Sequence, residues 1–489
     1  MQKLPITLYR NEQIRELDRI AIHEYDIAGF ELMSRAGDAL FQQLTRLCPA
    51  VQSVAVFCGM GNNAGDGYIV ANLLLNAGLS VCVYSVANTC QLKGDALTAY
   101  QHYAAAHGKI IHYQTKVKLT ADVIVDALFG SGLNKAVTGL YANAIATINQ
   151  SGAFVLAVDI PSGLNADTGN VMGVAVKANA TVTFIGLNQG LFTGQAADYC
   201  GDIIYESLAI PDAVLTMQVP SAMRVIHQPL PRRLRYTHKG SYGHVLIIGG
   251  ELGYLGAARL AGEAALRVGA GLVSVATRSS HAGLMTINRP ELMCHGVETG
   301  EQLMPLLAKA SVISIGTGLG QSDWAIELLI TAVLATQKPL IIDADALNLL
   351  ACNPITNSNW ILTPHPAEAA RLLHCTTADI QQDRFAAVSA LQAKYHGVAI
   401  LKGSGSLIAS NKTIAVSNTG NAGMASGGMG DVLTGVLAGL VAQGLSLEQA
   451  AQQGVFLHGL AADKAALADG ERGLLASDLM PYLRRGMNE

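Results

Sequence analysis

Residues 416–441 read VSNTGNAGMASGGMGDVLTGVLAGLV, in which a glycine-rich loop leads directly into an apolar segment. The loop contains five glycines within eleven residues, at Gly420, Gly423, Gly427, Gly428 and Gly430. After Asp431, apolar residues recur at the spacing of a helix, and Gly444 follows at a position where helices commonly end. Since the segment is apolar on nearly every side, it predicts a buried helix with Asp431 in its first turn.

The start of this helix predicts a site for an anion. The first backbone N–H groups of a helix have no partners within it, and the helix dipole places positive charge there, so phosphate is the expected ligand. Asp431 would lie beside that anion. The carboxylate could cap the helix, or it could act as a general base on a hydroxyl, and this stretch alone leaves both interpretations open.

The composition favours α/β domains that act on small molecules. The chain has 489 residues, a net charge of -4 and only 14% charged residues, which argues against a nucleic-acid-binding surface. No apolar run reaches the roughly 18 residues that span a membrane, and the N-terminus has no signal-peptide pattern. Eight cysteines without CxxC spacing are typical of reduced thiols and predict a cytoplasmic protein.

The α/β pattern of the first half starts at residues 54–58 (VAVFC), a predicted buried strand that runs into the loop GMGNNAGDG. A strand, a glycine loop and a helix in this order form a phosphate-binding turn. The loop has no Walker lysine, and its glycine spacing misses the dinucleotide fingerprint by one residue. The next predicted strand, 81–85, is followed by no acidic residue before Asp95. These differences argue against a domain that transfers hydride.

Polar residues follow several predicted strands of the first half, namely Asp126, Asp159 with Ser162, and Asn188. Because ligands of open α/β sheets bind at the carboxyl ends of the strands, we expect these residues to converge with Asn63 and Asp66. Each Asp could instead be only a turn or cap residue. Together, an amide, carboxylates and a hydroxyl without His or Cys would suit a hard cation with oxygen ligands.

A proline-rich stretch, 211–243, separates the two halves, and we predict domains over 1–215 and 216–489. The stretch ends in PRRLRYTHKG, whose arginines could contact phosphate or form a solvated linker. Beyond it, strands and helices alternate in a second βαβ array.

The predicted strand ends of the second half carry small or polar residues: Gly253, Gly318, Asp343, His365 and the loop KGSGS at 402–406. His365 lies between two prolines, so it could belong to a rigid turn before a helix that starts at Ala367 or Glu368. KGSGS could contact a phosphate or a base, although short glycine-serine turns are common.

The motifs of the second half, taken in order, resemble the ribokinase-like superfamily. The loop GGMGD ends in Asp431, and HVLIIGG, IGTGLG, IIDADALN, LTPHPAE and LKGSGS are similar to the NAD(P)H-hydrate dehydratases of that superfamily. In the first half, GNNAGDG, VDALFGSGL and VDIPSGLNADTG resemble the NAD(P)H-hydrate epimerase domain. The order and coverage are similar to bifunctional NAD(P)H-hydrate repair enzymes. The resemblance implies an N-terminal Rossmann-like βαβ sandwich and a C-terminal ribokinase-like α/β sandwich.

This resemblance implies a bifunctional enzyme, an isomerase joined to a hydro-lyase. It would epimerise the R and S forms of hydrated NADH and NADPH. It would then dehydrate the S form at the expense of ADP or ATP, giving AMP or ADP and phosphate, with Mg²⁺ on the phosphates and K⁺ in the first domain. Asp431 would be the base of the dehydratase, and Asp159 the acid or base of the epimerase. We also expect a homo-oligomer.

The resemblance further implies a set of binding residues. In the first domain, substrate would contact Asn62, Asn63, Ala64, Gly65, Asp66, Gly130, Ser131, Gly132, Leu133, Asn134, Lys135, Ala136 and Asp159. In the second domain, substrate would contact Gly253, Gly318, His365 and Asp431. The adenine nucleotide would contact Lys402, Gly403, Ser404, Gly405, Ser406 and Gly430. Potassium would be held by Asn63, Asp126 and Ser162. Two positions depart from the family pattern, since Ala64 and Ala367 stand where glycine is usual, and we expect activity to survive both changes.

One alternative is a sugar or vitamin kinase of the ribokinase-like superfamily with a non-catalytic N-terminal ligand-binding module. In such a kinase, Asp431 would activate a hydroxyl that stays phosphorylated. A kinase alone has no need of GNNAGDG or VDIPSGL, so the motifs of the first half favour the repair enzyme.

Overall fold

The computed structural model describes residues 4–115, 117 and 119–489 and divides the chain into two compact units, Met1–Met223 and Arg224–Glu489. This division falls eight residues beyond the predicted boundary (223 against 215). Its cause is the pairing of β10 (Ala222–Arg224) with β1 (Thr7–Tyr9), in which Met223 lies opposite Thr7. Among the described helices, none has both the length and the apolar character needed to cross a bilayer.

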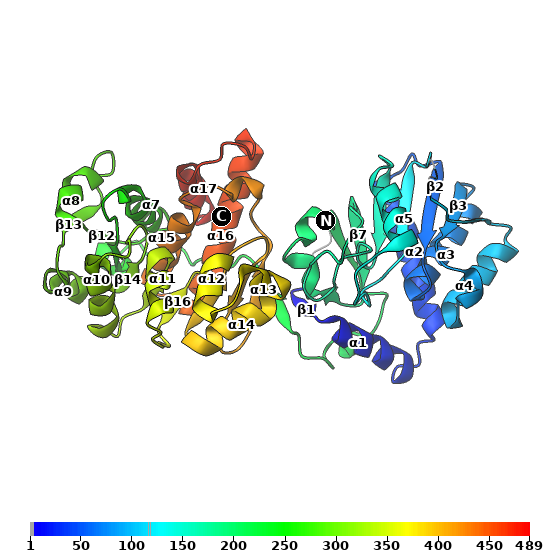
Figure 1. Ribbon diagram of the computed structural model, residues 1–489, viewed down its shortest axis with the longest axis horizontal. Coiled ribbons are helices and arrows are strands. Elements are labelled where there is room, and N and C mark those ends of the chain that lie inside the picture. The colour runs from blue at the N-terminus through cyan, green and yellow to red at the C-terminus, as the bar shows by residue number, and fades with distance from the viewer. Residues whose placement is uncertain (1–3, 116, 118) are drawn as a thin grey trace. The chain divides into compact units, whose positions relative to one another are not determined.

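The first unit is built on a seven-stranded, fully parallel sheet (Figure 1). Its strands, in spatial order, are β4 (Lys109–His112), β3 (Ser80–Ser85), β2 (Ser53–Cys58), β5 (Val123–Ala127), β6 (Phe154–Val158), β7 (Ala180–Phe184) and β9 (Asp202–Glu206). From β2 the chain first adds strands on one side and then, from β5 onward, on the other. The order therefore reverses between β2 and β5, where open α/β sheets bind their ligands.

Helices cover both faces of this sheet. They are α1 (Asn11–His23), α2 (Gly29–Leu47), α3 (Asn62–Asn76), α4 (Gly94–Ala105), α5 (Gly139–Asn149) and the short α6 (Asp212–Leu215). Along β2, Val54 and Val56 pack into the core beneath α2 and α3, whereas Ala55 and Phe57 pack into the core beneath α5. Both sides of the strand are apolar because both faces of a parallel sheet are covered.

The second unit contains nine strands, whose spatial order is β13 (Met293–Gly296), β12 (Leu272–Thr277), β11 (His244–Ile248), β14 (Val312–Ile315), β15 (Leu340–Ile342), β16 (Trp360–Leu362), β17 (Val398–Leu401), β18 (Ser406–Ala409) and β19 (Ile414–Ser417). The strands from β13 to β17 are parallel, and β18 and β19 add an antiparallel edge. The order reverses between β11 and β14, which predicts a second ligand crevice.

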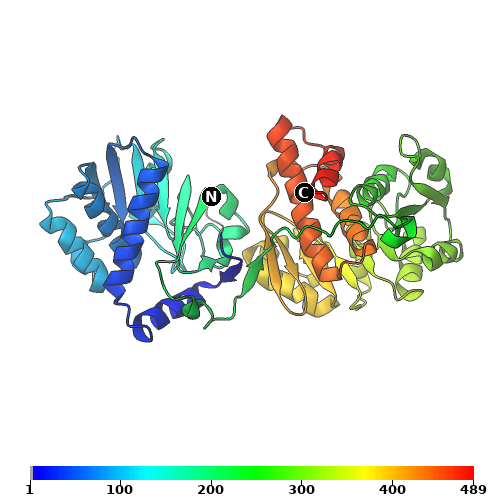
Figure 2. The ribbon, with the colours of Figure 1, turned by 180° about the vertical axis from the view of Figure 1, so that it is seen from behind.

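Eleven helices of the second unit lie within the described residues: α7 (Leu255–Arg267), α8 (Ser279–Met285), α9 (Gly300–Lys309), α10 (Asp323–Leu334), α11 (Ala344–Cys352), α12 (Pro366–Leu373), α13 (Thr377–Gln382), α14 (Arg384–Tyr395), α15 (Met429–Ala442), α16 (Leu447–Asp469) and α17 (Leu479–Gly486). In Figure 2, α16 runs beside α17. The helix predicted around Asp431 is α15, and Gly444 follows its end at φ +95°.

Helix α15 is central to the second unit because it packs against α7, α16 and the middle of the sheet. Glycines allow this close approach. A Cβ atom on Gly435 would lie 2.0 Å from the carbonyl oxygen of Ala261 on α7, and one on Gly439 would lie 2.5 Å from Val268. The neighbouring helix and the sheet therefore fix the position of the α15 N-terminus and of Asp431 with it.

Candidate active sites

The N-terminus of α15 forms the first candidate site. Gly428 is the N-cap residue, with φ +90°, and Asp431 is the third residue of the helix. The interpretation of Asp431 as the N-cap is therefore wrong. Burial, followed by the charge of Asp343, raises the pKa of Asp431 to about 7. A carboxyl group with this pKa can accept a proton near neutral pH.

The ammonium group of Lys402 lies at the same helix N-terminus. A Cβ atom on Gly430 would be 3.3 Å from Lys402 Nζ, so this side chain borders the predicted anion site. Its Nζ donates to Asp343 Oδ1 at 2.9 Å and lies 3.8 Å from Glu368 Oε2. Burial opposes the charged form, but these carboxylates hold the pKa of Lys402 above its usual value. The site therefore adds a fixed positive charge to the helix amides.

Asp343, at the end of β15, holds this lysine in place. The carboxylate is buried and accepts hydrogen bonds from Lys402, from Thr363 Oγ1 at 2.7 Å and from Thr434 Oγ1 at 2.7 Å. Burial alone would raise the pKa of Asp343, but the lysine charge and these donors hold it below its usual value. Thr434 belongs to α15, so one carboxylate ties the lysine to the helix that carries Asp431.

His365 is the N-cap residue of α12, which starts at Pro366, one residue before the earlier of the two predicted starts. Its Nδ1 accepts from the amide of Ala367 at 3.1 Å, and Glu368 Oε2 accepts from the amide of His365 at 2.8 Å. This capping box is a rigid turn of the kind that the flanking prolines suggested. Burial and the nearby Lys402 lower the pKa of His365, so its ring is neutral at physiological pH.

The glycines predicted to contact substrate lie in the loops after β11 and β14. Gly253 has φ +88° and Gly318 has φ +57°. A Cβ atom on Gly318 would lie 2.7 Å from Tyr254, so the two loops are in contact. The amide of Gly320 also donates to Asp345 Oδ2 at 2.8 Å, which links these loops to the strand end that carries Asp343.

The KGSGS loop at 402–406 connects β17 to β18, and a buried arginine supports it from below. Arg384 donates to the carbonyl oxygen of Leu401 at 3.3 Å and to that of Gly405 at 3.4 Å. A Cβ atom on Gly403 would lie 2.9 Å from the guanidinium group. Sequence reasoning missed Arg384, because an arginine at the start of a helix gives no signal that it packs beneath a distant loop.

The second candidate site is a cavity of about 840 Å³ in the first unit, at the carboxyl ends of β2, β5, β6 and β7. The predicted residues that line it are Asn62, Asn63, Asp66, Gly130, Ser131, Gly132, Leu133, Asn134, Lys135 and Asp159. Three other predicted residues, Ala64, Gly65 and Ala136, are not among the described residues of its wall. Ala64 is buried within α3.

Asp159 lies at the end of β6 with φ +65°, a left-handed conformation that is uncommon for a residue other than glycine. Its Oδ2 accepts from the amide of Ser131 at 3.1 Å, and its Oδ1 accepts from Thr183 Oγ1 at 3.4 Å. Burial raises its pKa despite these donors. The carboxylate is thus fixed against the loop 130–136, which follows β5.

The predicted cation ligands lie beneath this loop. Ser162 Oγ donates to Asp126 Oδ1 at 2.6 Å and accepts from the amide of Phe129 at 2.8 Å. The Nδ2 atom of Asn63 is buried and has no hydrogen-bond partner among the described residues. Asp126 and Ser162 are themselves outside the cavity wall. Within the described ranges, no group of three or more His, Cys, Asp or Glu is arranged to hold a metal.

The expectation that Asn188 joins these residues is not met. Asn188 lies in β8 (Leu187–Asn188), which pairs with β1 rather than with the main sheet, and it is absent from the described cavity wall. Its side chain is fully buried, and neither amide atom has a partner among the described residues.

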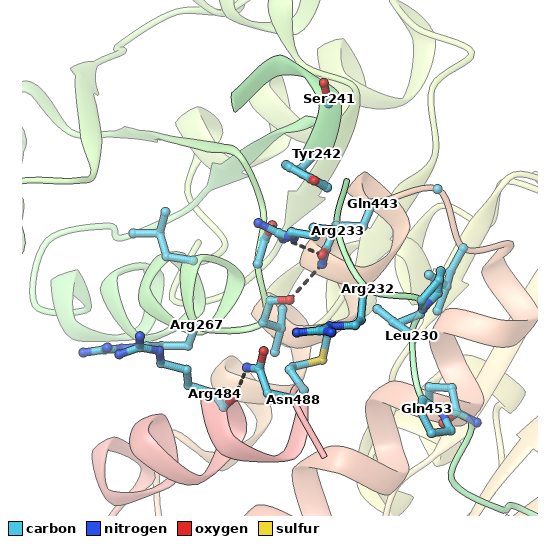
Figure 3. Close-up of a pocket in the computed structure, with 18 of the residues that line it drawn as sticks. Leu230, Arg232, Arg233, Ser241, Tyr242, Arg267, Gln443, Gln453, Arg484 and Asn488 are labelled. Carbon is cyan, nitrogen blue, oxygen red and sulfur yellow. Dashed lines mark hydrogen bonds between the residues drawn. The ribbon is translucent and has the colours of Figure 1, made fainter. Parts of the chain in front are cut away.

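The second unit also contains a larger cavity, of about 1480 Å³ (Figure 3). None of the predicted site residues is among the described residues that line it. It lies at the carboxyl ends of α7, α15 and α17, where the helix dipoles place negative charge, and five arginines are among the residues that line it. Arg233, of the predicted linker, donates to Gln443 at 2.8 Å and stacks over the ring of Tyr242. This arginine anchors the linker, which also crosses α16 in Figure 2.

Two α/β units, each with carboxylates at the carboxyl ends of parallel strands, define a two-domain α/β enzyme whose second site has the parts needed for phosphoryl transfer. The family described as NAD(P)H-hydrate dehydratase matches residues 245–485, and the family described as YjeF-related protein N-terminus matches residues 29–190. The bifunctional NAD(P)H-hydrate repair enzyme Nnr of Coxiella burnetii is 51% identical over 482 residues, covering 98% of both chains.

The enzyme of the same name from Escherichia coli is 42% identical over 490 residues and is matched over 99% of this chain and 95% of its own. An ADP/ATP-dependent NAD(P)H-hydrate dehydratase from Bacillus subtilis, co-crystallised with ATP and Mg²⁺, is 30% identical, with 53% of this chain and 94% of that chain covered and a TM-score of 0.48. The chain belongs to the family of bifunctional NAD(P)H-hydrate repair enzymes. The predicted family and the two-domain α/β class are therefore confirmed.

Proposed function

We propose that this protein repairs hydrated NADH and NADPH. The first unit interconverts the R and S forms, and the second converts the S form back to NADH or NADPH with ADP or ATP as phosphoryl donor. Family membership over nearly the whole chain supports both activities. The single observation that carries the proposal is the arrangement of Asp431, Gly430 and Lys402 at the N-terminus of α15.

This arrangement suits the elimination of a hydroxyl group. Hydroxide is a poor leaving group, whereas phosphate departs readily, so the hydroxyl of the hydrated ring is first phosphorylated. Asp431 takes the proton of that hydroxyl, since burial gives the carboxyl a pKa of about 7. The amides at the start of α15 and the ammonium group of Lys402 stabilise the charge on the transferred phosphoryl group.

Residues Gly403, Ser404, Gly405 and Ser406 would contact the adenine nucleotide, and Gly253, Gly318 and His365 the hydrated dinucleotide. The buried carboxylate of Glu368, 3.8 Å from Lys402 Nζ, fits Mg²⁺, which commonly uses one or two carboxylates together with substrate phosphates. When bound, Mg²⁺ would neutralise phosphate charge. Asp343 keeps Lys402 in position for the same phosphates.

In the first unit, Asp159 would act as acid or base at the hydroxyl-bearing carbon, and the loops at 62–66 and 130–136 would bind phosphates and ribose. Asp126, Ser162 and Asn63 offer carboxylate, hydroxyl and amide oxygen atoms, the kind of donor set that fits a hard cation such as K⁺. The cation would stabilise the loop 130–136, because Ser162 also bonds the backbone of Phe129.

We also propose that the protein is a cytoplasmic homo-oligomer. The eight cysteines are free thiols in the structure, and Cys90, Cys352 and Cys375 are exposed, which suits a reducing compartment. Light scattering of the purified protein measures its oligomeric state.

The test is to incubate the protein with hydrated NADH or NADPH and either nucleotide, and to follow nicotinamide absorbance together with free phosphate. We expect both to rise in equal amounts. A sugar or vitamin kinase would consume nucleotide with a sugar or vitamin, and would restore no absorbance. Absence of recovery with either nucleotide would contradict the proposal.

A further inference from the structure

Helix α1 contributes a face to the cavity of the first unit, although it precedes the family match at 29–190. Ile14, Arg15, Asp18 and Ile22 all line the cavity. Their spacing places them on one side of the helix. Leu17 and Ala21, on the adjacent side, are buried in the core, so the orientation of α1 is fixed by packing. The side chain of Asp18 is therefore held at the cavity wall.

Asp18 shares this cavity with two other carboxylates, Asp66 from α3 and Asp159 from the end of β6. Their mutual repulsion adds to the effect of burial. Burial and the charge of Asp159 raise the pKa of Asp18 to about 7, and the pKa of Asp66 is raised well above its usual value by the same causes. None of the three forms a salt bridge among the described residues. The cavity therefore disfavours the ionised form of its carboxyl groups.

The other charged groups that face Asp18 are Arg15 on its own helix, Asp95 on α4 and Lys135 in the loop 130–136. Arg15 partly offsets the rise in the pKa of Asp18. Its guanidinium group lies against the loop 130–136, since a Cβ atom on Gly132 would be 2.3 Å from Nη2. The phosphates of a dinucleotide bound by this loop would draw Arg15 towards themselves and leave Asp18 protonated.

We infer that Asp18 is a second catalytic residue of the epimerase, which donates a proton to the departing hydroxyl group while Asp159 activates water for addition to the opposite face. This inference rests on the proposed epimerase activity. It follows from the placement of the two carboxyl groups on separate elements, α1 and β6, around one cavity. Inversion by loss of the hydroxyl group and addition of water to the opposite side requires groups that reach both faces of the carbon.

The step balances as follows. The hydroxyl-bearing carbon is bonded to the ring nitrogen, whose lone pair forms an iminium bond as the carbon–oxygen bond breaks. The electron pair of that bond stays on oxygen, which takes the proton of Asp18 and leaves as water. A water molecule then adds to the opposite face, its oxygen pair forms the new bond, and the iminium pair returns to nitrogen. Asp159 takes the released proton, and solvent returns a proton to Asp18.

The test uses the full-length protein, with separated R and S forms of hydrated NADPH and chromatography of the isomers. We expect Asp18→Asn to lower the kcat of epimerisation about 100-fold or more. It should also abolish the fall in kcat above about pH 7 that deprotonation of Asp18 causes in the native protein. Glu12→Gln, an exposed change on the same helix, is the matched control and should leave the rate unchanged. Cooperative thermal unfolding of the first unit reports that each variant is folded, since dehydration of the S form depends on the second unit alone.

Epimerisation of hydrated NADPH by the native protein in H₂¹⁸O provides a test that needs no variant. We expect one ¹⁸O atom in the hydroxyl group for each inversion, after correction for exchange without enzyme. Retention of ¹⁶O would overturn the inference, because inversion would then proceed by opening of the ring. A native rate in a folded Asp18→Asn would overturn it as well. Absence of epimerisation by the native protein would instead contradict the proposed function.

Discussion

The two sites differ in the partners of their buried carboxylates and in the direction of the resulting pKa shifts. In the second unit, Asp343 is paired with Lys402 and accepts bonds from two threonines, and its pKa is held below the usual value. In the first unit, neither Asp18 nor Asp159 forms a salt bridge within the described residues, and burial raises both of their pKa values. A site for phosphoryl transfer needs fixed positive charge in addition to a base such as Asp431, whereas a site for epimerisation needs groups that exchange protons. The difference in pairing therefore matches the difference in chemistry.

Asp431→Asn is expected to have the largest effect. Loss of the general base should lower kcat of the dehydratase by about 10²–10⁴-fold and leave epimerisation unchanged. Asp323→Asn is a matched control, since Asp323 is also an acidic residue in the first turn of a helix and is exposed. If Asp431→Asn also slows interconversion of the R and S forms, the distinction between the two sites is wrong.

Lys402→Met tests the ion pair of the second site. Removal of the ammonium group leaves Asp343 buried without its partner, which should lower the free energy of unfolding of the second unit by about 3–5 kcal/mol. Urea denaturation measures this change. Lys412→Met, an exposed lysine in the turn after β18, should lie within about 0.5 kcal/mol of the native value. Equal stability of the two variants would mean that the buried pair contributes nothing.

A pair of threonine substitutions compares the two sites directly. Thr434→Val removes a 2.7 Å bond to the ionised Asp343 and should lower the free energy of unfolding by about 1.5–3 kcal/mol. Thr183→Val removes a 3.4 Å contact with Asp159 and should cost less than about 1 kcal/mol. Both threonines are fully buried, so the loss of a hydroxyl is otherwise similar. A larger cost for Thr183→Val would reverse the comparison.

The pH dependence of the dehydratase gives the smallest effect. Asp431 must be ionised to accept a proton, so kcat should rise about tenfold from pH 6 to pH 8, around its pKa of about 7. Stability should change in the opposite direction. The pKa of Asp431 in the folded protein exceeds the ordinary value of 3.8. The contribution of this carboxyl group to the free energy of unfolding is therefore fully present below pH 3.8 and is lost as the pH rises through 7.

Thermal unfolding at pH 8 checks this second trend. Asp431→Asn should melt at a higher temperature than the native protein, because it removes a charge for which burial and the repulsion of Asp343 outweigh the attraction of Lys402. At pH 4 the two proteins should melt at similar temperatures. A lower melting temperature of the variant at pH 8 would show that the carboxylate stabilises the fold.

The sequence predicts those features that depend on local pattern. Apolar runs and glycines define β2 and α15, and Asp431 lies in the first turn of α15 as expected. These features are predictable because the apolar periods of strands and helices, and the glycines at close approaches, involve residues that are close together in the sequence.

Features that depend on contacts between distant residues could not be predicted. The ion pair of Lys402 and Asp343 joins residues 59 positions apart. Arg384 lies under a loop that follows the next strand, and Asp18 lies on an amphipathic helix whose polar residues look like any solvated face. The pairing of Thr7 with Met223, which moves the domain boundary, spans most of the first unit. Only tertiary packing brings these groups together.

The central claim is that one chain contains two chemically independent sites that share a free substrate. It is tested most directly by supplying a mixture of R and S hydrates with excess nucleotide to Asp159→Ala, to Asp431→Asn, and to the two variants together. Asp159→Ala alone should restore absorbance only to the extent of the S form, apart from slow spontaneous interconversion, and Asp431→Asn alone should restore almost none. The mixture should recover the full amount. The claim would be contradicted if the absorbance restored by the mixed variants stopped at the amount of the S form. It would also be contradicted if Asp159→Ala alone restored the full absorbance rapidly.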